Sequence, residues 1–393
     1  MRGRPRCVLV LALAVALAGC APTSAGREAV ERVEPSDPND AEAPSWVSGE
    51  PFPTAAFSDL SEDPVSADAA AEFEAALRQM AGEGGMSATV ISPDGMWSGA
   101  VGKANRVRDV GINDQFAIGS VGKTFVVAQV MQMVERGELD LDDAAADHLP
   151  PNLDFDTNGA TIRHLLNMQS GIPDVYEAMR AEVEFRAHPR RTWTTAEMLE
   201  LIPDDRAPAG VFSYSNTGTL LLEPAIDHVR GRRVVDVMRN GGVLDVEGTD
   251  RLIYQPDERP TAPMALPNSG SIAEHAKNGG YLPSTAVATA GPTTGSQATD
   301  APSLARWWRA FCAGEIVSQE SLTEMAIDDD GYGLGLYTVS TYPTAVGHAG
   351  GVLGYTAWAG CLPDHGTVIV VLHNREVDDM GGMAGPLVSA AAD

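Results

Sequence analysis

The spacing of hydrophobic residues along the chain predicts a group of helices between two regions of strands. Residues 121–137 are apolar on almost every side and end at Gly137, which indicates a helix buried inside a domain. Residues 69–80 carry the one-sided apolar pattern of an amphipathic helix. Shorter helical patterns cover residues 161–171, 195–201 and 301–312.

Strand patterns lie toward the two ends of the chain. Residues 87–92 and 96–102 are two short runs joined by Pro93-Asp94-Gly95, which predicts a β-hairpin with its turn. Three further runs predict strands of an antiparallel sheet, at residues 332–339, 356–362 and 366–373.

These patterns together predict an α/β (α+β) fold, in which an antiparallel sheet is flanked by helices and a mostly helical lobe is inserted. We expect the α/β lobe at about 67–112 and 300–393, and the helical lobe at about 113–299. Residues 241–300 show no clear period. A structureless connection of that length is unusual inside a domain, so we expect short elements there.

The first residues predict export. Residues 1–6 are basic and residues 8–18 are apolar but too few to span a bilayer, so residues 1–19 have the character of a secretory signal. Leu17-Ala-Gly-Cys20 resembles the lipobox of bacterial lipoproteins, in which the cysteine is lipidated; the alternative is an ordinary signal peptide that contains a cysteine. Residues 20–66 are rich in Pro, Glu, Asp, Ser and Ala, which predicts a disordered tether between the outer face of a membrane and the domain.

The net charge and the cysteine content limit the binding partners and covalent links that we expect. The formal net charge of −27 argues against binding to nucleic acid or to anionic lipid surfaces. Cys312 and Cys361 remain when the signal and Cys20 are set aside, and whether they form a disulfide stays open, because sequence does not show how close their Cα atoms lie. The chain has no His-Glu-x-x-His or Cys-x-x-Cys spacing and no phosphate-binding loop, so we expect neither a metal nor a cofactor.

A serine and a lysine stand three residues apart where the buried helix begins. In a helix Ser120 and Lys123 share one face, with Cβ atoms roughly 5–6 Å apart, so the amine reaches the hydroxyl. Lysine occurs only at positions 103, 123 and 277 among 27 basic residues, and unlike arginine a desolvated lysine gives up its proton. The pair therefore predicts a nucleophile beside a base; the plainer interpretation is a helix cap beside a solvated lysine.

Two later stretches add polar groups, and the order of all three resembles a known family. They are Phe212-Ser-Tyr214-Ser-Asn216 and Gly347-His348-Ala349-Gly350-Gly351. With Ser120-Val-Gly-Lys123 they resemble the three motifs of the serine β-lactamase and penicillin-binding protein superfamily, closest to its class C β-lactamase, DD-carboxypeptidase and esterase branch. His348-Ala-Gly350 stands in the place of a Lys-Thr-Gly or His-x-Gly motif, and the resemblance runs from about residue 69 to the end.

The resemblance implies a route through an acyl-enzyme on Ser120. Either Lys123 or Tyr214 would take the serine proton, and the residues alone do not decide between them. The backbone N–H groups of Ser120 and Gly351 would hold the oxyanion. Asn216 would bind a substrate amide, and the third motif, with His348 and Gly350, would contact the substrate.

The third motif departs from the family at two positions that bear on the substrate. His348 would be partly charged near neutral pH, so we expect weak capture of a substrate carboxylate that changes around roughly pH 6–7. Ala349 replaces a threonine whose hydroxyl helps to hold that carboxylate. We therefore expect a serine hydrolase of DD-carboxypeptidase or esterase type, acting on a small molecule or peptide, rather than an efficient β-lactamase. The alternative is a penicillin-binding or sensor module of the same fold without turnover.

Overall fold

The computed structural model describes residues 50–261, 263–327, 331–337 and 345–392, all within one unit, Ala41–Asp393. The expected signal at 1–19, Cys20 and the expected tether as far as residue 49 lie outside the described residues. Within the described part of the chain, the helices are too short or too polar to cross a membrane.

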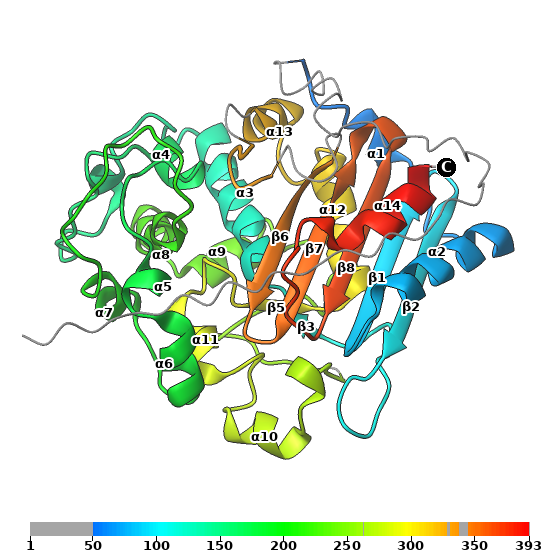
Figure 1. Ribbon diagram of the computed structural model, residues 1–393. Coiled ribbons are helices and arrows are strands. Elements are labelled where there is room, and N and C mark those ends of the chain that lie inside the picture. The colour runs from blue at the N-terminus through cyan, green and yellow to red at the C-terminus, as the bar shows by residue number, and fades with distance from the viewer. Residues whose placement is uncertain (1–49, 262, 328–330, 338–344, 393) are drawn as a thin grey trace, which may run out of the picture. The chain divides into compact units, whose positions relative to one another are not determined.

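A five-stranded antiparallel sheet forms the centre of the fold, in the order β2-β1-β8-β7-β6 (Figure 1). The predicted hairpin lies beside the last strand, with Met86 opposite His373, so segments from both ends of the chain share one sheet. The predicted antiparallel sheet is thereby confirmed. Its strands are β1 (Gly85–Ser92), β2 (Gly95–Gly102), β6 (Val346–Val352), β7 (Tyr355–Leu362) and β8 (Thr367–His373).

Both faces of this sheet are buried, because its strands carry apolar residues at successive positions. In β8, Val368, Val370 and Leu372 belong to one hydrophobic cluster, whereas Ile369 and Val371 belong to another. Helix α12 packs against the first face, and α2 and α14 cover the second (Figure 1). These helices are α2 (Ala67–Met80), α12 (Ala301–Cys312) and α14 (Gly385–Ala392).

The chain between β2 and β6 is mostly helical. Its first long helix, α3 (Gly122–Glu135), follows a single 3-10 turn, η3 (Gly119–Val121). Residues 241–300 contain short elements, as expected, and two of them join a small sheet of order β3-β5-β4. The other elements are α4 (Ile162–Leu166), α5 (Val175–Ala178), α6 (Ala181–Ala187), α7 (Thr195–Leu199), α8 (Asn216–Arg230), α9 (Val234–Arg239), α10 (Ile272–Lys277), α11 (Thr285–Ala290), α13 (Gln319–Ala326), β3 (Phe116–Ala117), β4 (Ile253–Tyr254) and β5 (Gln297–Thr299).

Helix α3 is buried on nearly all sides, as its sequence predicts. Phe125 packs edge-on against Trp307 of α12, with ring centroids 4.3 Å apart. The helix stops before Gly137, whose φ of +65° favours glycine. Because α3 runs through the interior, its first turn is held between the sheet and the helical part of the chain. The side chains of that turn are consequently withdrawn from solvent.

Residues 50–66, which precede the predicted domain boundary near residue 67, are folded. Residues 50–66 include the short helix α1 (Ala55–Ser58), and the Phe52 and Phe57 rings are fully buried and stack with centroids 6.2 Å apart. The Phe52 amide donates to Thr323 Oγ1 at 2.9 Å, which ties this segment to α13. The tether prediction is wrong for 50–66, because two aromatic anchors outweigh a polar average composition.

One of the three strands predicted near the end of the chain, at residues 332–339, differs in the structure. Within 331–337 there are only isolated bridges, Tyr332 with Tyr337 and Tyr337 with Gly347, and the edge is β6 instead. Glycines at 331, 333 and 335 break the expected strand, and Gly335 has φ +66°. The remainder of the predicted strand, at 338–339, lies outside the described residues.

A disulfide joins Cys312 and Cys361, with Cα atoms 6.8 Å apart. It connects the last residue of α12 to β7, so the helix is covalently held on the sheet. The two cysteines are separated by 49 residues. A cross-link across that loop reduces the freedom of the unfolded chain.

Replacing both cysteines, as Cys312→Ala with Cys361→Ala, should lower the free energy of unfolding by about 2–4 kcal/mol, because the unfolded chain regains its loop entropy. Urea unfolding followed by far-UV circular dichroism measures the change. A reducing agent should lower the parent's midpoint and leave that of the double variant unchanged. A parent whose midpoint ignores the reductant would contradict the stabilising role of the disulfide.

Candidate active site

Ser120 lies in the 3-10 turn that leads into α3, where strand β6 approaches it closely. Gly119 has φ +52°, and a Cβ atom there would lie 3.0 Å from the backbone nitrogen of Gly351. At Gly350 a Cβ atom would collide with the carbonyl oxygen of Ile118 and lie 2.9 Å from the Ser120 nitrogen. Glycine at these two positions therefore lets β6 press against the turn that carries the serine.

Lys123 is fully buried one turn further along. Its Nζ donates to Ser120 Oγ at 2.8 Å and to the carbonyl oxygen of Thr294 at 2.7 Å. Burial lowers the pKa of Lys123 to about 7, and the negative charge of Asp174 opposes this shift. Near neutral pH a large share of these amines is unprotonated and able to accept the serine proton.

Tyr214 also lies near the serine, in the loop before α8. The Lys123 Nζ lies 5.3 Å from the centroid of its ring. Burial raises the pKa of Tyr214 above its usual value, although a hydrogen bond with Ser120 acts in the opposite direction. The phenol is thus protonated at neutral pH. The structure brings Ser120, Lys123 and Tyr214 together, and of the last two only the amine has a pKa suited to a base.

Asn216 begins helix α8, and its amide is fixed by a residue that the sequence motifs did not single out. Its backbone N and its Nδ2 donate to Asp174 Oδ2 at 2.7 and 2.6 Å. Asp174 itself caps α5. An aspartate directly after a proline and before a short helix is a recognisable cap signal, but nothing in the sequence shows that it meets Asn216, 42 residues away.

His348 does not have the place expected of it. Its side chain is 1% exposed and packs edge-on against Tyr332 and Tyr337. Nδ1 donates to the Ala349 carbonyl oxygen at 2.5 Å, and Nε2 is left to accept from the Tyr332 hydroxyl at 3.2 Å. Burial, and then the charge of Lys123, lower the pKa of His348 to about 3.

The expectation that His348 captures a substrate carboxylate around pH 6–7 is therefore wrong. The ring is neutral over that range, is buried, and is not among the residues that line the pocket. The physical reason is the aromatic packing around β6, which removes water from the imidazole and leaves it no place for a charge. Gly350 likewise contributes close packing at Ser120, while Gly351 lies in the wall of the pocket.

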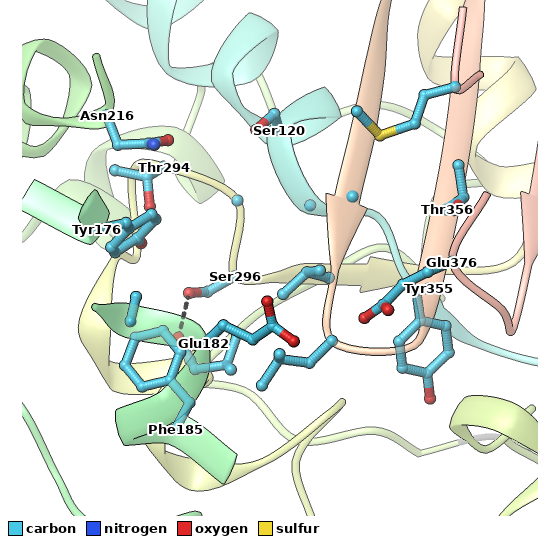
Figure 2. A pocket seen from close by; sticks show the side chains of 18 of the residues that line it. Ser120, Tyr176, Glu182, Phe185, Asn216, Thr294, Ser296, Tyr355, Thr356 and Glu376 are labelled. Atoms are coloured by element: carbon cyan, nitrogen blue, oxygen red, sulfur yellow. Dashed lines mark hydrogen bonds between the residues drawn. The ribbon is translucent and has the colours of Figure 1, made fainter. Parts of the chain in front are cut away.

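Ser120, Tyr214, Asn216 and Gly351 line a pocket of about 560 Å³, in which the half-buried Ser120 is accessible (Figure 2). Asn216, Thr294 and Tyr176 group on one side, and the Tyr176 hydroxyl donates to Thr294 Oγ1 at 2.5 Å. Sequence analysis missed Tyr176 and Thr294, which carry no motif. Four carboxylates also line the pocket, those of Asp174, Glu177, Glu182 and Glu376.

Comparison with known proteins finds relatives of this chain in sequence and in fold. A penicillin-binding protein of Bacillus subtilis (strain 168) is 24% identical over 297 residues, which cover 69% of this chain and 63% of that protein. This chain thus spans less than two thirds of its relative.

Solved structures repeat the fold. A D-stereospecific amidohydrolase from Streptomyces sp. superimposes with a TM-score of 0.63 at 24% identity, over 82% of this chain and 98% of that one. The D-amino acid amidase of Ochrobactrum anthropi SV3, complexed with D-phenylalanine, gives a TM-score of 0.65 at 20% identity, over 82% of this chain and 99% of that one.

The family comparison covers the whole region that contains the site. The beta-lactamase family matches residues 70–392, from the helix α2 to the last residue of α14. That range includes the serine, the amine, the phenol and the strand that presses on them. This chain belongs to the beta-lactamase family, whose members include serine hydrolases.

Proposed function

We propose that this protein hydrolyses an ester or a small amide through an acyl-enzyme on Ser120. The observation that carries the proposal is the buried Lys123 amine, 2.8 Å from the Ser120 oxygen and with a pKa of about 7. A serine hydroxyl becomes a useful nucleophile only when a neighbouring group takes its proton. Here that group is already in hydrogen-bonding contact with it.

The proton path follows from the two groups beside the serine. Lys123 takes the proton from Ser120 Oγ as the oxygen attacks the substrate carbonyl, and the carbonyl π electrons move onto its oxygen. When the tetrahedral intermediate collapses, the bond to the leaving group breaks and that group receives a proton through the ammonium and the Tyr214 phenol. Water then repeats the sequence on the acyl-enzyme, and the acid is released.

The oxyanion needs donors at the same place. We assign this role to the backbone N–H groups of Ser120 and Gly351, because β6 is pressed against the turn that carries the serine. Asn216 lines the pocket and offers an acceptor to a substrate amide. These assignments keep the roles that the motifs imply for all but His348 and Gly350.

The charge of the pocket bears on the substrate. Its four carboxylates repel a carboxylate on the substrate, and the neutral His348 gives such a group no compensation. We therefore favour esters or amides without a carboxylate, including amides of amino acids, over β-lactams and peptides that end in D-alanine. The structural likeness to a D-amino acid amidase supports an amide of this kind as the first substrate to test.

An active-site probe tests the assignment of the nucleophile. A fluorophosphonate should label Ser120 in peptide mapping, and Ser120→Ala should reduce kcat by about 10⁴–10⁶-fold. Ser58→Ala, at the exposed end of α1, serves as the matched control. The substrates are p-nitrophenyl butyrate, D-phenylalanine amide, nitrocefin and a D-Ala-D-Ala peptide, and we expect the first two to be preferred. Labelling of another residue would contradict the assignment of Ser120 as the nucleophile. An acyl group that never leaves Ser120 would instead support the alternative, a sensor module of the same fold without turnover.

The pH dependence tests the base. Because only the neutral amine accepts a proton, kcat/KM should fall about tenfold for each pH unit below the Lys123 pKa of about 7 and stay level above it. Lys123→Arg should abolish activity, since arginine keeps its proton, whereas Lys277→Arg on α10 should not. A parent whose activity persists undiminished to pH 5 would rule out Lys123 as the base.

We also propose that the protein is exported and held on the outer face of a bacterial membrane by lipid on Cys20. The support is the basic and apolar leader followed by Leu17-Ala-Gly-Cys20. Several acyl chains on one cysteine would anchor it stably. In cells fed an alkyne fatty acid the full chain should incorporate the label, and Cys20→Ala should lose it and leave the membrane fraction. Equal labelling of the variant would contradict the anchor.

A further inference from the structure

The carboxylate of Asp174 makes four hydrogen bonds at the wall of the pocket. Oδ2 accepts from the backbone N and the Nδ2 of Asn216, and Oδ1 accepts from the backbone N of Tyr176 at 2.6 Å and of Glu177 at 3.1 Å. The aspartate thereby joins the start of α5 to the start of α8. Its four accepted bonds fix the position of the carboxylate.

These bonds determine which way the Asn216 amide faces. A carboxylate accepts hydrogen bonds and donates none, so the NH₂ group of Asn216 must be the end that meets Asp174. The carbonyl oxygen of the amide is then the end left for the pocket, which Asn216 lines. An acceptor in that position suits an N–H group of a substrate amide and gives nothing to a simple ester.

The same carboxylate acts on the base. Lys123 is faced by Ser120 from η3, by the Thr294 carbonyl from the loop before β5, by Tyr214 from the loop before α8 and by neutral His348 from β6. Asp174 supplies a negative charge to this group, which favours the protonated amine and so opposes the effect of burial.

We propose that Asp174 is a positioning residue that turns the Asn216 carbonyl toward the substrate and adds a negative charge to the surroundings of Lys123. This inference rests on the proposed function, because it assigns a role within the same site. The two effects of Asp174, on the Asn216 amide and on the Lys123 amine, change different measured quantities. The orientation of the amide governs preference for amide over ester substrates, and the charge governs the pH at which the enzyme loses activity.

Asp174→Asn tests both effects. The variant loses the negative charge, and an amide at position 174 no longer fixes the orientation of the Asn216 amide. The kcat/KM for D-phenylalanine amide should therefore fall about 10- to 100-fold, and that for p-nitrophenyl butyrate should fall much less. The acid limb of the kcat/KM profile should move to lower pH, because the pKa of Lys123 falls when the opposing charge is removed. Asp174→Glu keeps the charge but displaces it, so it should lose the amide preference while its acid limb stays closer to that of the parent.

Controls distinguish the possible failures. Asp156→Asn removes one exposed carboxylate outside the pocket and should change neither observable. Thermal unfolding shows whether each variant is folded, and fluorophosphonate labelling gives the fraction of molecules in which Ser120 is reactive. If the parent itself is neither labelled nor active, the proposed function fails. If the parent is active but Asp174→Asn loses both substrates equally with an unmoved acid limb, Asp174 is merely structural and this inference is overturned.

Discussion

The removal of one amine from water is the constraint on which the site depends. Lys123 has no solvent exposure, and its Nζ donates to the Ser120 oxygen and the Thr294 carbonyl in place of water. Burial penalises the charged form, and the pKa falls to about 7. That outcome requires a helix that passes through the interior, which is why α3 is apolar on nearly all sides. The serine thereby has a base in hydrogen-bonding contact with it.

The fold around that helix brings three distant parts of the chain to the same place. The edge strand β6 closes against η3 through glycines, the loop before β5 supplies the Thr294 carbonyl, and the start of α8 supplies Asn216. The neutral histidine in β6 leaves Lys123 as the basic group nearest the serine within the described part of the site. The electrostatics of the pocket are consequently set by one titrating amine and the carboxylates around it.

The features that the sequence predicted correctly mostly depend on residues close together in the chain. Ser120 and Lys123 meet because they are three residues apart, within one helical turn, and the hairpin of β1 and β2 follows from two adjacent strand patterns and the turn signal between them. The position of Asp174 depends on a contact across 42 residues, which no local pattern encodes. The charge state of His348 depends on the aromatic rings that pack on it. Phe52 and Phe57 were missed for a similar reason. The surrounding sequence is acidic and rich in proline, so its composition did not indicate that these two rings are buried.

The strand order has a consequence for synthesis. β8 lies between β1 and β7, so the hairpin made first by the ribosome has no partner on its inner edge until residues 367–373 have been translated. The sheet is assembled from contacts of very long sequence separation, and such contacts form slowly. The nascent chain accordingly stays without its central sheet for almost the whole of translation. A leader at its start would have that interval in which to bring an unfolded chain to a translocation channel.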